Sequence, residues 1–222
     1  RMVEIDKTVE PDSFVSIDNV NIQDLGLHTL RSKISIIPQV PVIFSGTIKR
    51  NLDPFGAYTE EDLWRVLEEV NLKDYVMSLE IKLDTEVSAS AQIFSVGQKQ
   101  LICLARAILK KAKIIVLDEA TANVDFETDN FIQKTIMEKF KDCTVFTIAH
   151  RLTTIANYDK ILVMDKGHLA EFDSPYRLLV ENIGDTTITK RDGLFASMVR
   201  NTGRQTAQYI LNTSREKFFK DV

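Results

Sequence analysis

Cysteine, tryptophan and histidine are scarce in this chain of 222 residues, which holds two cysteines, one tryptophan and three histidines. Cys103 and Cys143 stand far apart, and neither belongs to a C-x-x-C pair. This spacing argues against a cysteine-rich metal cluster and against a disulfide framework. A reducing, cytosolic setting is the interpretation that the cysteine usage favours.

Long apolar runs and an excess of basic residues are also absent. Apolar runs such as 114–117 and 161–164 have the length of strands, whereas a membrane-spanning helix needs about 18 consecutive apolar residues. We therefore expect no spanning helix in these residues. Lys and Arg total 28 against 32 Asp and Glu, a net charge of −4, so the composition argues against a partner that is nucleic acid.

The length and the first residues bear on how the chain is organised. At about 100–200 residues per domain, this length suggests one domain, or a domain with an appendage. Arg1 comes first and Met2 second, and no signal peptide's apolar stretch follows. We expect the chain to begin inside a longer protein.

Local patterns in the first half predict a hairpin, a strand and three helices. Residues 14–17 and 20–22 alternate around Asp18-Asn19, a pair that tolerates the positive φ of a tight turn. A β-rich run over 33–37 is closed by Pro38, which puts Gln39 at a strand end. Helical periodicity or caps predict helices that begin at Thr59, over 74–79 and over 95–111.

The second half predicts a parallel β-α-β unit followed by a hairpin. The run 114–117 is too short for a helix and indicates a strand buried on both faces, and 144–148 indicates another buried strand. A helix over about 126–140 joins them. Strands over 160–164 and 168–172 flank a turn, and short helices and a tail of scattered apolar residues follow Pro175.

Two adjacent carboxylates, Asp118 and Glu119, follow the strand 114–117. Open α/β sheets bind ligands at the carboxyl ends of their parallel strands. One carboxylate at such a place could bind Mg²⁺ while the other polarises an attacking water. Helix capping at a strand exit is the alternative for this pair. His150 follows the strand 144–148 and could reach a phosphate there, although a lone histidine is usually structural.

The segment Phe94-Ser95-Val96-Gly97-Gln98 leads into the helix predicted over 95–111. Ser95 can cap this helix, and the backbone N–H groups around Gly97 would present its N-terminus to an anion. An ordinary helix cap is again the alternative. The order of the motifs decides the matter, because Ser-x-Gly-Gln, a buried strand ending in Asp-Glu, Asp125 and His150 follow one another along the chain.

In this joint pattern the chain resembles the nucleotide-binding domain of ATP-binding cassette (ABC) transporters from about Asp18 to Ser174. In that family Gln39 matches the Q-loop glutamine, 94–98 the signature motif and 114–118 the Walker B strand. Glu119 matches the catalytic base, 121–125 the D-loop and His150 the switch histidine. The segment Asn51-Leu52-Asp53-Pro54-Phe55 and the valine inside the signature are similar to the second such domain of subfamily C exporters, the multidrug-resistance-associated proteins.

Three features depart from the family pattern. The Walker A loop, G-x-x-x-x-G-K-[ST], appears nowhere among the 222 residues. Because that loop supplies most contacts to the β- and γ-phosphates, we expect this chain alone to bind ATP poorly and to be inactive. Residues 88–93 replace a glycine-containing segment that commonly precedes the signature, and Val40 stands where an acidic residue is frequent.

The resemblance implies a fold, a site and a set of partners. The fold is α/β: a P-loop NTPase-like ABC ATPase fold with a mostly parallel sheet, an antiparallel edge and a helical signature subdomain at about 59–111, lacking its first strand, Walker A loop and following helix. The domain would cover 1–203, and 204–222 would be a helical or disordered tail. Glu119 and His150 would be catalytic, and Gln39 and Asp118 would hold Mg²⁺. Nucleotide-binding residues would be Gln39, Ser95, Val96, Gly97, Gln98, Asp118 and Asp125.

The same resemblance implies a function. A second nucleotide-binding domain would pair with this one head to tail, so that the ATP bound by the second domain lies against the signature residues of this chain. Transmembrane domains of the same transporter would export organic anions or xenobiotics. The chain would then lie at the cytoplasmic face of a membrane, expected to be the plasma membrane. Two rivals stay open: a truncated cassette that acts only as an interaction module, and a soluble ABC ATPase. The absent Walker A loop favours the first for the isolated chain, and the Asn-Leu-Asp-Pro segment weighs against the second.

Overall fold

The computed structural model describes residues 13–88, 93–119, 124–149 and 151–220. The contacts divide the chain into two compact units, 1–148 and 149–222. The division predicted at residue 203 remains a prediction.

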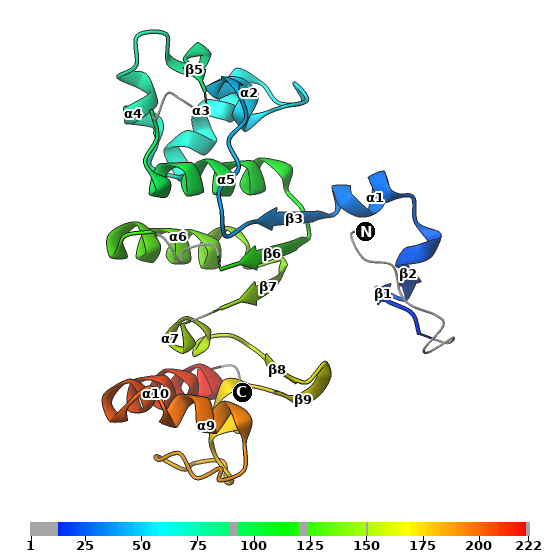
Figure 1. Cartoon of the computed structure of the whole chain (residues 1–222), viewed down its shortest axis with the longest axis vertical. Helices are drawn as coiled ribbons and strands as arrows, with labels where there is room; N and C mark the ends of the chain where they lie inside the picture. Colours follow the sequence, from blue (N-terminus) through cyan, green and yellow to red (C-terminus); the bar gives the residue numbers. More distant parts are fainter. Residues whose placement is uncertain (1–12, 89–92, 120–123, 150, 221–222) are drawn as a thin grey trace. The chain divides into compact units, whose positions relative to one another are not determined.

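A three-stranded parallel sheet organises the first unit (Figure 1). Its strands, β3 (Ile34–Ile37), β6 (Ile114–Asp118) and β7 (Thr144–Ile148), lie in the order β3-β6-β7. Helix α6 (Phe126–Lys139) connects β6 to β7. The register pairs Ile37 with Leu117 and Asp118 with Ile148, so the three strands end at one edge of the sheet. The predicted β-α-β unit is confirmed.

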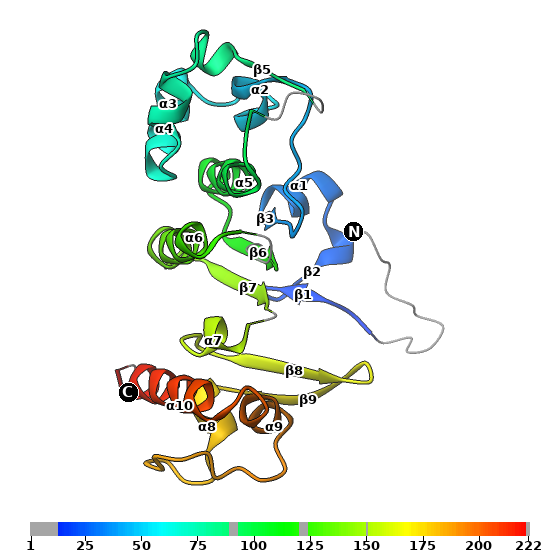
Figure 2. The same ribbon diagram turned by 60° about the vertical axis from the view of Figure 1, so that its left-hand side comes forward.

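Helix α5 (Val96–Lys110) runs along β3 in the opposite direction. Near its start, Gln100 Nε2 donates to the carbonyl oxygen of Pro38, just past the end of β3, at 3.0 Å. Near its end, Lys110 Nζ donates to the carbonyl oxygen of Ile34, at the beginning of β3, at 2.6 Å. The first turn of α5 therefore lies toward the same edge at which the strands end, and Figure 2 gives a second view of this arrangement.

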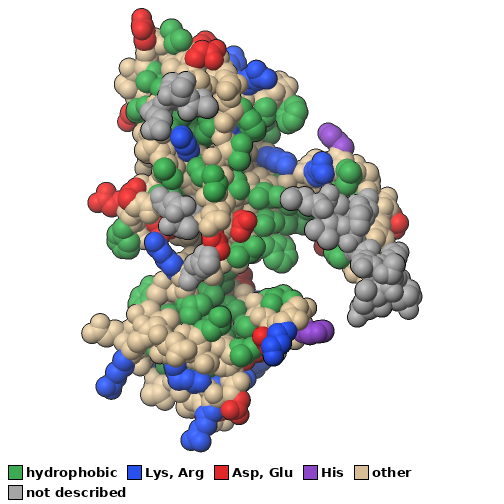
Figure 3. Space-filling model, in the orientation of Figure 1, with side chains coloured by type: hydrophobic (Ala, Val, Ile, Leu, Met, Phe, Trp, Pro, Cys, Tyr) green, Lys and Arg blue, Asp and Glu red, His purple; other side chains and the backbone are tan. Residues whose placement is uncertain are grey.

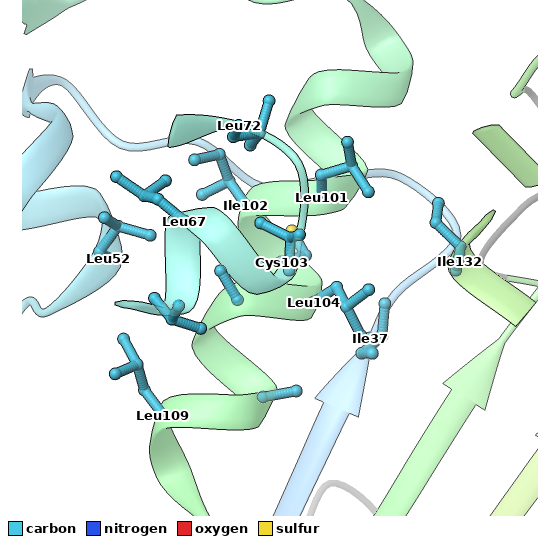
Figure 4. Packing of buried hydrophobic residues seen from close by; sticks show 14 of the residues in the cluster. Ile37, Leu52, Leu67, Leu72, Leu101, Ile102, Cys103, Leu104, Leu109 and Ile132 are labelled. Carbon is cyan, nitrogen blue, oxygen red and sulfur yellow. The ribbon is translucent and has the colours of Figure 1, made fainter. Parts of the chain in front are cut away.

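The core of the first unit lies on both sides of α5. In Figure 4, Leu104 of α5 lies next to Ile37 of β3, while Ile102 points the other way, toward Leu67 and Leu72. Ile37, Ile102, Leu67 and Leu104 are all fully buried. Burying a leucine or isoleucine side chain stabilises a fold by about 1.5–3 kcal/mol. Packing on two faces thus fixes α5, and with it the candidate signature segment.

The prediction that the run 144–148 is buried was wrong. Phe146 is 58% exposed and Ile148 56% exposed. β7 is the edge strand of this sheet, and alternation turns these side chains to the face opposite that of the buried Ile115 and Leu117. Ile36, which shares that face of the sheet, is 60% exposed. Apolar side chains gather on the surface over these strands in Figure 3.

β6 agrees only in part with the expectation of burial on two faces. Ile115 and Leu117 are buried, whereas Ile114 and Val116 are half-buried. The neighbouring strands cover the edges of β6, but α5 and α6 contribute buried residues to the core on one face only. An apolar run alone does not distinguish these two situations.

Several short helices and strands pack beyond α5. They include the predicted helices α3 (Glu60–Glu69) and α4 (Lys73–Met77). The others were not predicted from the sequence: α2 (Ile48–Leu52), the 3-10 helix η2 (Lys82–Asp84), and the antiparallel pair β4 (Gly46–Thr47) and β5 (Glu86–Val87). Thr59 and Asp62 form the expected capping box at the start of α3. The limits 59–111 of the helical subdomain remain a prediction.

The first described residues form the predicted hairpin. β1 (Ser16–Ile17) pairs antiparallel with β2 (Val20–Asn21). Asp18 and Asn19 take φ values of 49° and 64° in the turn, the left-handed conformation that these residue types tolerate. The 3-10 helix η1 (Ile22–Asp24) and helix α1 (Leu27–Ser32) follow and lead into β3.

The second unit has a hydrophobic core of its own. It contains α7 (Leu152–Ile155), the hairpin β8 (Ile161–Asp165) and β9 (His168–Asp173), α8 (Pro175–Leu179), α9 (Leu194–Arg200) and α10 (Arg204–Lys220). The antiparallel hairpin is confirmed. The tail predicted as helical or disordered contains the helix α10. Phe195 of α9 and Ile210 of α10 are buried in this core, so α10 packs through an apolar face. Among the described residues, no helix is long and apolar enough to span a bilayer.

Candidate functional site

Asp118 and Glu119 lie at the end of the central strand β6. Asp118 is the last residue of β6 and is exposed, and Glu119 is half-buried. The Glu119 N–H donates to the Ile148 carbonyl oxygen at 3.1 Å, which extends the β6–β7 ladder by one bond. Glu119 also has a φ of 46°. This left-handed conformation turns the chain out of the strand. The backbone at the end of the sheet therefore fixes the position from which the Glu119 side chain extends.

Gln39 meets the Glu119 carboxylate directly. Its Nε2 donates to Glu119 Oε2 at 2.5 Å, although the two residues are 80 positions apart. β3 and β6 are neighbours in the sheet, and Pro38 ends β3, so Gln39 emerges beside Glu119. The structure therefore brings together three of the predicted site residues, Gln39, Asp118 and Glu119. This group is called the strand-end cluster below.

The strand-end cluster offers oxygen ligands of the kind that Mg²⁺ prefers. The Asp118 carboxylate is exposed, and the Gln39 amide carries one oxygen that does not take part in the bond to Glu119. Mg²⁺ is usually held by one or two carboxylates together with phosphate oxygens and water, not by a complete protein cage. Among the described residues there is no group of three or more His, Cys, Asp or Glu side chains that could form such a cage. A site completed by a phosphate ligand therefore fits these residues.

The signature segment forms the first turn of α5. Ser95 Oγ accepts a hydrogen bond from the Gln98 N–H at 3.1 Å, and Gln98 Oε1 accepts one from the Ser95 N–H at 2.9 Å. This reciprocal pair is a capping box, and it satisfies two donors at the helix N-terminus. Val96 is 49% exposed. Ser95 is therefore the N-cap of α5, as predicted from the sequence, and it is exposed on the surface.

Gly97 lies against the start of α6. A β-carbon at this position would stand 3.3 Å from Thr128 Cγ2 and 3.5 Å from Val124 Cγ1. Asp125 caps α6, and its carboxylate accepts the Thr128 N–H at 2.9 Å. Hydrogen bonds from Thr128 lower the pKa of the Asp125 carboxyl below its ordinary value. Gly97 and Asp125, from two predicted motifs, thus both lie next to Thr128.

Two groups of predicted residues therefore occupy the edge at which the strands end. The strand-end cluster is one of them, and the helix starts of α5 and α6 hold the other, with Ser95, Val96, Gly97, Gln98 and Asp125. His150 lies outside the described residues, as do 121–123 of the predicted D-loop and 89–92 of the segment before the signature. Their expected roles remain predictions.

Sequence reasoning missed the side chains that support this edge. Gln100 is buried and bonds to the carbonyl oxygen of Pro38, the residue before Gln39. Arg106, also on α5, donates to the carbonyl oxygens of Val42 and Asn51. A signal was present in the sequence, because Arg106 interrupts an otherwise apolar helical stretch of leucine, alanine and isoleucine.

Comparison with known proteins agrees with this geometry. The family model described as "ABC transporter" matches residues 7–122. ATP-binding cassette sub-family C member 4 of Homo sapiens is 50% identical over 211 residues, which is 95% of this chain and 15% of that protein. Sub-family C member 3 of Homo sapiens is 52% identical over 189 residues, 85% of this chain and 12% of that protein.

A relative from an insect gives a similar result. The probable multidrug resistance-associated protein lethal(2)03659 of Drosophila melanogaster is 51% identical over 208 residues, 93% of this chain and 14% of that protein. The chain thus spans 12–15% of the length of these relatives. The ABC ATPase fold and the subfamily C resemblance predicted from the motifs are both confirmed. With a family model that matches more than half of its length, the chain belongs to the ABC transporter family.

Proposed function

We propose that this chain forms most of a nucleotide-binding domain, the second of two, in an ATP-driven exporter of the multidrug-resistance-associated type. Its identity of 50% or more to sub-family C members 3 and 4 over most of its length supports this assignment. In such a protein it hydrolyses ATP and thereby drives the export of organic anions or xenobiotics. The Walker A loop, absent from these residues, comes from the sequence that precedes them in the exporter.

The position of Glu119 carries the proposal. Its carboxylate stands where β6 ends, with one oxygen bonded to the Gln39 amide and its backbone tied to β7. A carboxylate held in this way orients a water molecule and takes up its proton as the water attacks the γ-phosphate of ATP. Phosphoryl transfer needs little covalent chemistry from the protein, so this positioning supplies much of the catalysis.

The other site residues bind the reactants. Gln39 and Asp118 supply oxygen ligands to Mg²⁺, which neutralises phosphate charge when it is bound. His150 contacts the γ-phosphate. Ser95, Val96, Gly97, Gln98 and Asp125 serve the nucleotide held by the opposite domain. The place of the four signature residues at the start of α5 supports this role, because backbone N–H groups at a helix N-terminus attract anions.

The proposed partners follow from this arrangement. The domain pairs head to tail with a second nucleotide-binding domain, and transmembrane domains of the same transporter respond to the closure of the pair. The chain then lies at the cytoplasmic face of a membrane, which we propose is the plasma membrane. We also propose that residues 1–203 belong to the nucleotide-binding domain and that 204–222 form its C-terminal tail.

Replacing Glu119 by glutamine tests the proposal. The 222 residues are placed in human sub-family C member 4 in exchange for the 50% identical segment, so that the upstream sequence of that protein is present. Glu119→Gln keeps the shape of the side chain and its capacity to accept from Gln39, but it removes the base. We expect ATP turnover in purified protein to fall by on the order of a hundredfold or more, because general base catalysis contributes about 10²–10⁴-fold. ATP binding should be retained.

The control is Glu138→Gln, a change at an exposed glutamate of α6 for which the described residues provide one recorded ion pair, with Lys134 at 3.9 Å on the surface. This variant should keep the turnover of the unmodified chimera. Turnover in Glu119→Gln equal to that of the control would remove Glu119 from its catalytic role. The isolated 222-residue chain should show no turnover in the same assay. Turnover there would show that another surface replaces the Walker A loop.

A further inference from the structure

Helix α5 holds the backbone on both sides of Gln39. Gln100 Nε2 donates to the Pro38 carbonyl oxygen at 3.0 Å, directly before Gln39. Arg106 Nη1 donates to the Val42 carbonyl oxygen at 2.5 Å, a few residues after it. The two donors stand on one helix. Gln39 is therefore carried by a short stretch of chain whose two ends are attached to α5.

Arg106 makes the larger part of this attachment. Its Nε donates to the Asn51 carbonyl oxygen at 2.5 Å, and its Nη2 donates to Asn51 Oδ1 at 3.0 Å. The centre of the guanidinium lies 5.0 Å from the centroid of the Phe44 ring, within the range of a cation–π interaction. One side chain thus contacts Val42, Phe44 and Asn51.

Asn51 completes the network. Its side chain is fully buried, and its Nδ2 donates to the Phe44 and Thr47 carbonyl oxygens at 2.8 and 3.0 Å. Its Oδ1 accepts the Phe44 N–H at 2.8 Å in addition to the bond from Arg106. Backbone groups of the segment 42–47 are therefore bonded either to Arg106 or to Asn51. Asn51 is itself bonded to Arg106, so the segment is attached to α5 through the Arg106 side chain.

The chemistry of arginine suits this position. Burial lowers the pKa of the Arg106 guanidinium, and the nearby Cys103 opposes this shift. A desolvated charge is costly unless hydrogen-bond acceptors surround it, and here carbonyl oxygens provide them. The planar guanidinium presents its donors in a rigid fork, whereas a lysine ammonium at the same place is a compact point charge on a flexible stem. Loss of Arg106 would remove its Nε donor from the partly buried Asn51 carbonyl oxygen, and would take one donor each from the Val42 carbonyl oxygen and from Asn51 Oδ1.

We propose that Arg106 is a positioning residue that fixes the segment 38–51 on α5 and thereby keeps the Gln39 amide in contact with the Glu119 carboxylate. Because α5 begins with the signature segment, the same attachment joins that segment to Gln39. The effect of this on ATP hydrolysis rests on the proposed function. The positioning itself does not.

Hydrogen exchange of the complete 222-residue chain, without nucleotide, tests the positioning. In Arg106→Met, which keeps an unbranched apolar stem, we expect backbone amides in 39–47 to exchange on the order of tenfold faster or more, since a hydrogen bond to a charged group contributes about 1.5–3 kcal/mol. Amides in α3 and β7 should keep their rates. The matched control is Lys99→Met on the same helix. The Lys99 side chain makes no hydrogen bond recorded among the described residues.

Two results would overturn the proposal. One is unchanged exchange in 39–47. The other is equal acceleration in 39–47, α3 and β7, which would mean that Arg106 only stabilises the fold. Should Arg106→Met not fold, Arg106→Lys decides the question, because a lysine retains the charge but not the fork. It should speed exchange in 39–47 alone and shift the side-chain amide resonances of Gln39, which Lys99→Met should leave in place. Exchange rates and Gln39 resonances like those of the unmodified chain would contradict the need for arginine.

These experiments do not depend on catalysis. If Glu119→Gln retained full ATP turnover, the role proposed for Glu119 would fail while the exchange data still decided the role of Arg106. If exchange in 39–47 did not respond to Arg106, the positioning would fail while the role of Glu119 remained open to its own test.

Discussion

Gly97 leaves little room for a side chain where α5 begins. A β-carbon there would meet Thr128 Cγ2 at 3.3 Å, closer than an ordinary van der Waals contact. The glycine thus allows the first turns of α5 and α6 to approach each other. Two motifs that are separate in the sequence become neighbours for this reason, and the Asp125 cap is held beside the signature segment.

Gly97→Val should destabilise the chain by about 1–3 kcal/mol, the usual cost of overpacking. Its branched methyl groups would force Thr128 and Val124 aside. Urea unfolding, monitored by circular dichroism, measures the change in the free energy of unfolding. Thr128→Ser removes the crowding methyl group but keeps the hydroxyl, so the double variant should recover part of the loss. Gly26→Val is the control, because nothing lies within 4 Å of a β-carbon at Gly26. An equal loss in both valine variants would contradict the explanation by crowding.

At the scale of the element, helix caps tie stability to pH. The Asp62 carboxylate at the start of α3 accepts the Thr59 hydroxyl at 2.9 Å and the Thr59 N–H at 3.3 Å. These bonds, together with the charge of Arg65, lower the pKa of Asp62 below its ordinary value. The ionised form therefore favours the folded chain. Its contribution is complete above the unfolded pKa of about 3.9 and is lost as the pH falls through the lower folded value.

Asp62→Asn should accordingly lower the urea midpoint of unfolding at pH 7. The difference in this midpoint between the variant and the unmodified chain should be smaller at pH 3. The variant lacks the charge that favours folding at neutral pH, and the contribution of that charge to the unmodified chain decreases as the pH falls below the unfolded pKa of about 3.9. Glu61→Gln, which changes a neighbouring glutamate in the same first turn, serves as the control. A gap that stayed constant between the two pH values would indicate that the titration of Asp62 does not contribute.

The sequence predicted long or capped elements better than short or edge elements. α5 and α3 begin within one residue of their predicted starts, because Ser95 and Thr59 form capping boxes that can be recognised in the sequence. The short elements α2, β4 and β5 were missed, since two to five residues show no measurable periodicity. The burial of β7 was predicted wrongly, because an apolar run does not reveal whether a neighbouring element covers it.

The candidate site shows the same limits. Local sequence predicted that Asp118 and Glu119 follow a buried strand and that Gln39 stands at a strand end, and the resemblance to the ABC family implied that Gln39 and Asp118 bind the same Mg²⁺. The bond between Gln39 and Glu119 required the order of the strands, which local sequence does not contain. Arg106 was missed because its partners are backbone carbonyl oxygens, and these have no signature in the sequence.

At the scale of the whole molecule, the described residues form two hydrophobic cores. One cluster of buried side chains lies entirely within the first unit and the other entirely within the second. Contiguous groups of contacts of this kind often open as separate cooperative units. Damage to one core should then leave the protection of the other intact, which hydrogen exchange can measure in the complete chain.

Phe195→Ala tests this independence. Phe195 is 1% exposed in the second core, and removing a buried phenylalanine side chain costs about 3–5 kcal/mol. Amides of α9 and α10 should exchange much faster or lose protection entirely, whereas those of α5 and β6 should keep their rates. Met198→Ala on the same helix removes a side chain that is 52% exposed and should change neither unit. If Phe195→Ala also accelerated α5 and β6 to the same extent, the two units would unfold together, and a single cooperative structure would replace the two inferred from their separate cores.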